Sequence, residues 1–254
     1  MRGGPPVEAW LRASRKPGTA DATAWVGADP APRATAARQA STAARDSSGV
    51  ITFDGEVPEL GGLDLSPDPF CVDGNPAGLR EHGLIVGADD GLANVFIQLT
   101  GVPDEKYDTP DEAVIIDQRG CRYFPHVFGM MKRQDIKILN SDATLHNIHA
   151  VPRENREFNV GMPNKGMEIE KTFKKVEDAI LIKCDVHPWM KAYAFCLEHP
   201  YFAVTDENGK FELRTAGLPD GDYGVKIWHE VLGTATGEVS VSGGAASFDH
   251  EWKE

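Results

Sequence analysis

The stretch Cys184-Asp185-Val186-His187-Pro188-Trp189-Met190 places a thiol, an imidazole and a thioether at intervals of three residues. It follows directly on the apolar run at 180–183, which is typical of a β-strand. Thirty-eight residues before the cysteine, the stretch Asn140-Ser141-Asp142-Ala143-Thr144-Leu145-His146-Asn147-Ile148-His149 supplies a second imidazole at the start of another strand-like run. Two histidines, one cysteine and a weak axial methionine are the ligand set of a blue-copper electron-transfer site. The two stretches together therefore predict a copper site.

Residues 123–195 resemble a cupredoxin of the plastocyanin and amicyanin type, including the amicyanin of methylamine utilisation. The Cys-x2-His-x2-Met spacing is similar to that of amicyanin, and Phe124-Pro125 and the His-Asn-Ile-His run fit the same pattern. The resemblance implies one type 1 copper ion and a hydrogen bond between Asn147 and the cysteine loop. Pro188 in this loop restrains its backbone. It assigns four copper ligands: His146, Cys184, His187 and Met190.

Each of these residues also has an ordinary structural interpretation. Cys184 alone would be an inert buried cysteine, Met190 a core residue, and His146 a hydrogen-bonded structural histidine. The alternative to copper binding is therefore a cupredoxin-like domain that uses these residues structurally. A Cys-His nucleophile is not favoured, since neither a third group nor oxyanion donors can be named. Four other histidines are assigned structural or surface roles: His126, His149, His199 and His229.

Composition and charge argue against several classes of function. The 254 residues carry a net charge of −13, with 41% hydrophobic and 26% charged residues, as in an ordinary globular protein. Because this charge repels phosphate backbones, the sequence predicts no nucleic-acid partner. No apolar run reaches the roughly 18 residues of a spanning helix. No secretory leader is visible either, so export is not predicted from the sequence itself.

The first 48 residues differ from the rest. Residues 1–50 contain seven basic and four acidic side chains, a net of +3, which leaves −16 for the remainder. They are rich in Ala, Pro, Gly, Ser and Thr and show no lasting apolar period. We expect residues 1–48 to be an irregular tail that a partner orders, with Trp10, Leu11 and Trp25 as anchors.

From residue 49 onward the pattern indicates an all-β protein. Asn208-Gly209 predicts a hairpin, 218–222 another tight turn, and 171–178 a helical turn or two. Many short strands separated by turns are typical of sandwiches. The predicted strands are 50–53, 93–99, 113–116, 135–139, 148–151, 179–183, 192–196, 202–205, 210–213, 223–228 and 237–241. The expected fold is a cupredoxin Greek-key sandwich plus a second small β-sandwich.

The second sandwich has a resemblance of its own. Residues 201–213 and 217–227 resemble the carboxypeptidase regulatory-like, transthyretin-like β-sandwich, whose first strands are similar to 49–55 and 92–99. We therefore expect a cupredoxin-like copper domain at 111–197, inserted into a second domain formed by 49–110 and 198–254. The alternative is simple succession, with 49–197 as one elaborated cupredoxin. A scaffold and docking role is expected for the second domain.

With Cys184 on copper, three cysteines remain. Cys71 and Cys121 lie in turn-rich sequence, and we predict that they form a disulfide, which implies an oxidising compartment. The alternative is two free thiols, since pairing does not follow from sequence alone. Cys196, on an apolar strand, is expected to be a buried small hydrophobe.

Two functions follow. The first is a periplasmic, non-enzymatic type 1 copper protein that passes single electrons to a redox partner, a cytochrome or a membrane electron-transfer complex. His187 would present its imidazole edge, rimmed by Pro188 and Trp189, and the tail would add a second docking contact. The alternative is a structural subunit of a respiratory or photosynthetic membrane complex, in which copper is optional.

Overall fold

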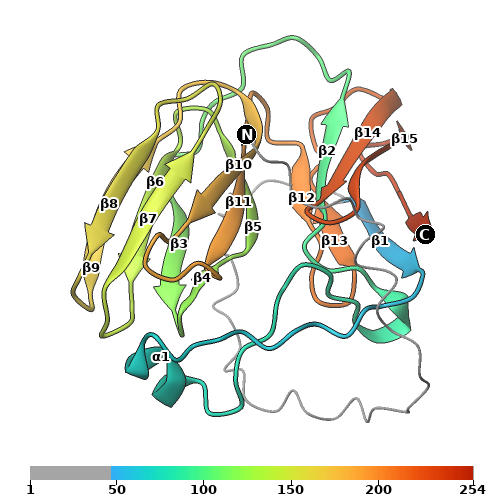
Figure 1. Ribbon diagram of the computed structural model, residues 1–254. Coiled ribbons are helices and arrows are strands. Elements are labelled where there is room, and N and C mark those ends of the chain that lie inside the picture. The colour runs from blue at the N-terminus through green and yellow to red at the C-terminus, as the bar shows by residue number, and fades with distance from the viewer. Residues whose placement is uncertain (1–46, 254) are drawn as a thin grey trace. The chain divides into compact units, whose positions relative to one another are not determined.

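The computed structural model describes residues 47–253, and within them the protein is almost entirely β (Figure 1). The predicted all-β class is confirmed. The expected tail, with Trp10, Leu11 and Trp25, lies outside the described residues except for Ser47 and Ser48, which already belong to the first strand, β1. The described helices are the α-helix α1 (Pro69–Gly74) and the single 3-10 turn η2 (Ala88–Asp90). Neither they nor any other described segment forms a helix long and apolar enough to cross a membrane.

The first sandwich is built from residues 114–197. One sheet has the order β4 (Arg122–Phe124), β3 (Val114–Arg119), β6 (Asp135–Asn140), β9 (Met167–Thr172). The other has the order β5 (Val127–Met131), β11 (Lys191–Leu197), β10 (Glu177–Lys183), β7 (His146–Val151), β8 (Phe158–Met162). Two neighbouring pairs, β3 with β6 and β5 with β11, run parallel and the others antiparallel. Alternating side chains such as Ile136, Ile138 and Ile148 fill the core between the sheets.

The second sandwich combines strands from both ends of the described chain. One sheet has the order β13 (Lys210–Leu213), β1 (Ser47–Asp54), β16 (His250–Lys253). The other has the order β12 (Phe202–Val204), β2 (Phe96–Thr100), β14 (Gly221–His229), β15 (Gly233–Val241). Both β1 and β2, which precede residue 110, thus pair with strands that follow residue 200.

Aromatic side chains join the two sandwiches. The ring of Phe96 stacks on that of Phe195 with the centroids 3.8 Å apart. Gly129 lies so close to the ring of Phe202 that a Cβ atom there would be 2.5 Å from it, so no side chain fits at this position. A buried polar contact completes the junction, because the Glu230 carboxylate meets both His126 (2.5 Å) and Lys191 (2.6 Å).

Two local predictions were wrong. Residues 171–178 form no helix: they comprise the end of β9, a loop and the start of β10. The side-chain oxygen of Asn155 accepts the backbone N–H groups of Lys174 and Lys175, which fixes the loop in a non-helical shape. The turn at Asn208-Gly209 is present, but β12 and β13 enter different sheets instead of pairing as a hairpin. Sequence patterns did not predict six further elements: α1, β4, β5, β8, β9 and β16.

Candidate metal centre

The loop between β10 and β11 carries Cys184 at its start and Met190 at its end. The backbone N–H of Cys184 donates to the carbonyl of Met190 (3.1 Å), and that of Met190 donates to the carbonyl of His187 (2.9 Å). The backbone N–H of His187 also points at the Cys184 sulfur, 3.4 Å away. This short loop is therefore closed on itself, and its cysteine and second histidine are side by side.

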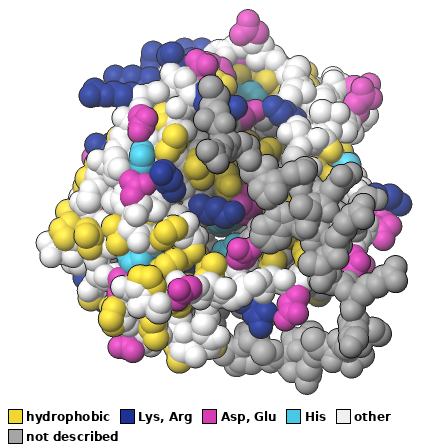
Figure 2. Space-filling view, viewed as in Figure 1, with side chains coloured by type: hydrophobic (Ala, Val, Ile, Leu, Met, Phe, Trp, Pro, Cys, Tyr) yellow, Lys and Arg dark blue, Asp and Glu magenta, His cyan; other side chains and the backbone are white. Residues whose placement is uncertain are grey.

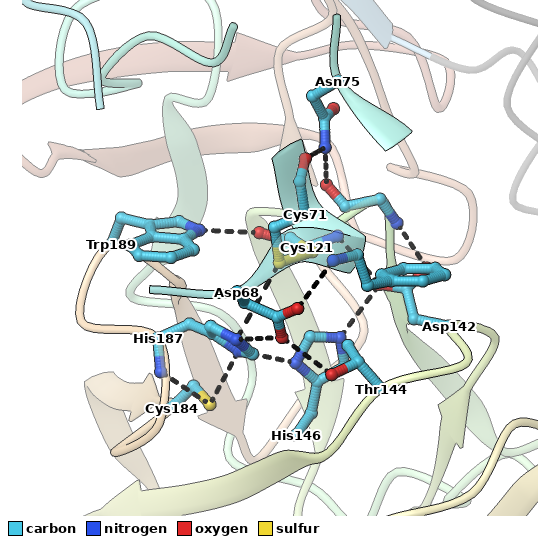
Figure 3. The surroundings of a disulfide bond; sticks show 12 residues. Asp68, Cys71, Asn75, Cys121, Asp142, Thr144, His146, Cys184, His187 and Trp189 are labelled. Carbon is cyan, nitrogen blue, oxygen red and sulfur yellow. Dashed lines mark hydrogen bonds and ion pairs between the residues drawn. A yellow bond between two sulfur atoms is a disulfide. The ribbon is translucent and has the colours of Figure 1, made fainter. Parts of the chain in front are cut away.

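Three donors converge at this end of the first sandwich (Figure 3). His146 is the first residue of β7, and its Nδ1 lies 2.9 Å from Nδ1 of His187. Nδ1 of His187 lies 3.9 Å from Sγ of Cys184. The ligand atoms of these three residues are all within 4.8 Å of one another, and all three side chains are buried. The structure thus brings together three of the four predicted ligands.

Met190 is buried beside them at 1% exposure, and its backbone is bonded to both Cys184 and His187. Pro188, in contrast, lies on the surface of the same loop. Met190 therefore ends the loop that carries two of the donors. That its sulfur is a copper ligand stays a prediction.

Asn147 ties β7 to the ligand loop. Its side-chain oxygen accepts the backbone N–H of Asp185 (2.7 Å) and lies 3.2 Å from Sγ of Cys184. In both contacts the oxygen of Asn147 is the acceptor and the cysteine loop supplies the donor. They fix the sulfur relative to the strand that carries His146.

The charges at the cluster differ from those of ordinary buried side chains. Burial favours the neutral thiol of Cys184, but the neighbouring His146 and His187 outweigh it and lower the pKa to about 6. For Cys196, free and buried in the same sandwich, burial and nearby Glu177 raise the pKa to about 12. Burial likewise disfavours charged His146, yet Asp142 and Cys184 raise its pKa to about 9. Both shifts favour a thiolate beside a protonated imidazole.

This donor set fits copper. A thiolate and two imidazoles are soft and borderline ligands, as both oxidation states of copper require, and metal binding to such groups releases protons. Strand β7, the ligand loop and Asn147 hold the three donors within 4.8 Å of one another. His146, Cys184 and His187 are therefore the residues that could hold a copper ion.

The prediction that His187 lies at the surface was wrong. His187 was expected to present its imidazole edge at the surface, but its side chain is only 1% exposed. Asp68, which caps the N-terminus of α1, covers that edge: its Oδ2 lies 2.9 Å from Nε2 of His187. This contact could not be predicted from local sequence patterns because 119 residues separate Asp68 from His187.

Residues 63–79, which include α1, form a cap on the first sandwich, and a disulfide links this cap to the sandwich. Cys71 in α1 is bonded to Cys121, the pair proposed from the sequence, with the Cα atoms 5.7 Å apart. Asn75 donates to the carbonyl of Cys71, and Trp189 donates through its indole N–H to the carbonyl of Cys121. Three cap side chains pack on the core of the first sandwich: Leu63, Phe70 and Leu79.

Sequence reasoning missed two carboxylates at the site. Asp142 Oδ2 lies 2.9 Å from Nε2 of His146, four residues away, and this short spacing was the available signal. Burial opposes ionisation of Asp142, but His146 and the backbone N–H groups of Cys121 and Gly120 lower its pKa overall. Burial also opposes ionisation of Asp68, and contacts with Thr144 and His187 again lower its pKa overall. Each imidazole therefore has a charged carboxylate behind it.

The four histidines that were assigned structural or surface roles make ordinary contacts. Nδ1 of His149 lies 2.9 Å from Asp185 and its Nε2 2.8 Å from Glu157, so it faces away from the donor cluster. His126 joins Glu230 between the sandwiches. His199 and His229 accept backbone N–H groups close by in the chain.

Comparison with known proteins finds likeness only in structure. No protein-family model matches the chain, and no curated protein matches it. A copper-containing nitrite reductase from Thermus scotoductus SA-01 matches at 18% identity and TM-score 0.33, over 39% of this chain and 25% of that one. A purple cupredoxin from Nitrosopumilus maritimus matches at 19% identity and TM-score 0.29, over 33% of this chain and 98% of that one. An oxidized amicyanin variant matches at 17% identity and TM-score 0.31, over 39% and 91%. Each of these matches covers less than two fifths of this chain.

Proposed function

We propose that this protein is an electron-transfer protein with one type 1 copper ion. The convergence of His146, Cys184 and His187, with the lowered pKa of the cysteine, carries the proposal. Copper bound there would supply a one-electron couple. Because backbone hydrogen bonds fix the loop that carries Cys184 and His187, the residues that would hold the ion would move little between oxidation states, which would favour fast electron exchange. In this proposal the protein transforms no substrate.

Because the imidazole of His187 is buried, a redox partner cannot contact it directly, and electrons need another side chain to reach the surface. The indole of Trp189 lies against that imidazole, with ring centroids 5.0 Å apart, and it is partly exposed. We infer that electrons pass between His187 and the partner through Trp189, over a surface that includes exposed Pro188. On the face drawn in Figure 2, acidic and basic side chains are interspersed with apolar ones. The net negative charge would steer a basic redox protein towards the molecule.

A scaffold role is the second candidate. The burial of His187 under the cap favours it, since a shielded ligand suits a domain in which copper is not exchanging electrons with outside partners. In this version the protein is a non-enzymatic subunit of a membrane electron-transfer complex. Removal of residues 1–46 would then abolish binding to the complex without changing the fold, whereas a carrier would keep its electron-exchange activity.

The domain organisation and location are part of the same proposal. Residues 111–197 would be an insertion in a carboxypeptidase regulatory-like sandwich formed by 49–110 and 198–254, from which the cap, residues 63–79, reaches over to pack on the first sandwich. The pairing of β2 with β12 and β14 supports this arrangement. The Cys71–Cys121 disulfide supports an oxidising compartment such as the periplasm.

A matched pair of cysteine variants tests the copper proposal. Cys184→Ser should abolish the intense blue absorption that arises from charge transfer between a cysteine thiolate and copper. Cys196→Ser removes the other free, buried thiol and should leave that absorption unchanged. A wild-type protein that stays colourless with Cu(II), or a Cys184→Ser protein that remains blue, would refute the proposal.

A further inference from the structure

The two ring nitrogens of each histidine at the metal centre have separate tasks. The Nδ1 atoms of His146 and His187 face each other and the thiolate. The Nε2 atoms point the opposite way, and each lies 2.9 Å from a carboxylate oxygen, of Asp142 and Asp68 respectively. A ring whose Nδ1 binds a metal carries its proton on Nε2, so each carboxylate accepts a hydrogen bond from a ligand.

The two carboxylates are themselves fixed by several donors. Asp142 accepts the backbone N–H groups of Gly120 and Cys121, both at 2.8 Å. Asp68 accepts the backbone N–H of Phe70 at 2.8 Å and the hydroxyl of Thr144 at 2.7 Å. The side chains of Asp142 and Asp68 are 6% and 15% exposed. Neither carboxylate can turn away from its imidazole without losing these bonds.

One disulfide connects the two carboxylates. Cys71 follows Asp68 by three residues, in the short helix that Asp68 caps, while the backbone N–H of Cys121 donates to Asp142. The Cys71–Cys121 bond therefore joins the segment that positions one carboxylate to the segment that positions the other (Figure 3). The sulfur of Cys71 lies 3.8 Å from Nε2 of His187, so the cross-link reaches the site itself.

We propose that Asp68 and Asp142 are positioning residues that orient both copper-binding imidazoles and favour Cu(II) over Cu(I), with the Cys71–Cys121 disulfide fixing their separation. The proposal rests on the copper function proposed above. A carboxylate behind an imidazole makes the ring a stronger donor, and the two negative charges stabilise the more positive ion. Both effects lower the reduction potential of the site.

The test uses the full-length, copper-loaded protein as wild type, Asp68→Asn and Asp142→Asn. Asp135→Asn, on the exposed start of β6, is the control that removes the same charge elsewhere. Loss of such a partner typically weakens metal binding by about 10-fold to 100-fold. Where the loss falls on Cu(II) alone, the potential rises by about 59 mV for each tenfold change. We expect both variants to remain blue with raised potentials, and the control to keep the wild-type potential.

A measurement without metal separates positioning from mere packing. In the metal-free wild type, nitrogen NMR of labelled imidazoles should show the proton of His187 on Nε2, strongly hydrogen-bonded, and Asp68→Asn should weaken this bond. Should Asp142→Asn fail to fold, Asp68→Asn and Thr144→Val, which removes one donor to Asp68, decide the matter.

Blue variants with wild-type potentials would overturn the inference and leave the copper function standing. A wild-type protein that takes up no copper would overturn both.

Discussion

The two sandwiches differ in what they bury. At one end of the first sandwich, His146, His187, Cys184 and Asp142 lie buried side by side. The buried side chains of the second sandwich are mainly aliphatic and aromatic, with polar exceptions such as Thr205, Thr215 and His229, and its ionisable Glu230 is buried at the junction with the first sandwich. Burying ionisable groups together costs free energy that aliphatic packing does not. Buried clusters of ionisable groups are therefore typical of functional sites. We expect metal binding in the first sandwich and a structural role for the second.

The largest effect is expected from the cross-link beside the site. The double variant Cys71→Ser, Cys121→Ser opens a loop with a sequence separation of 50 residues and should lose about 4 kcal/mol in the free energy of unfolding. Urea unfolding measures this loss, with Cys196→Ser as the control that breaks no cross-link. If the double variant is as stable as the control, the cap does not depend on the disulfide.

One isoleucine-to-alanine change in the core of each sandwich separates an effect on stability from an effect on the metal centre. Ile148 in β7 and Ile227 in β14 are both fully buried, so each change to Ala should cost about 3 kcal/mol. Only Ile148→Ala, two residues from His146, should also alter the copper absorption spectrum. An altered spectrum in Ile227→Ala would show that the second sandwich shapes the site directly.

The junction between the sandwiches should respond to acid. Burial alone would raise the pKa of Glu230, but His126 and Lys191 lower it overall. Its stabilising effect is therefore complete above the unfolded pKa, near pH 4.3, and is lost as the pH falls through the lower folded pKa. Glu230→Gln should lose about 2 kcal/mol at neutral pH and show less of this acid destabilisation. Equal pH profiles for the variant and the wild type, from unfolding at several pH values, would contradict this account.

The smallest effect concerns the electron path. Trp189 contacts His187, whereas Trp228 packs on Phe195 between the sandwiches. Trp189→Leu should slow oxidation by a small ruthenium complex about tenfold, equivalent to roughly 1.4 kcal/mol, at unchanged potential. Trp228→Leu should keep the wild-type rate, as stopped-flow absorption would show. Equal rates in all three proteins would exclude the path through Trp189.

Local patterns predicted more of this protein than distant contacts did. Alternating apolar residues placed most strands, and the spacing of Cys184, His187 and Met190 located the ligand loop, because both features depend on residues close in the chain. The contact between Asp68 and His187 could not be read from the sequence, since it depends on a cap brought there by folding. Strands such as β9, with exposed charged side chains at alternate positions, were missed because a charge run resembles any solvated segment.

We propose that His146, Cys184 and His187 bind one copper ion, and X-ray absorption at the copper edge of the purified, copper-loaded protein measures this binding. We expect one copper per chain with one short bond to sulfur and two bonds to imidazole nitrogen. A copper ion surrounded by oxygen and nitrogen alone, with no sulfur neighbour, would show that Cys184 is not a ligand and would refute the proposed site.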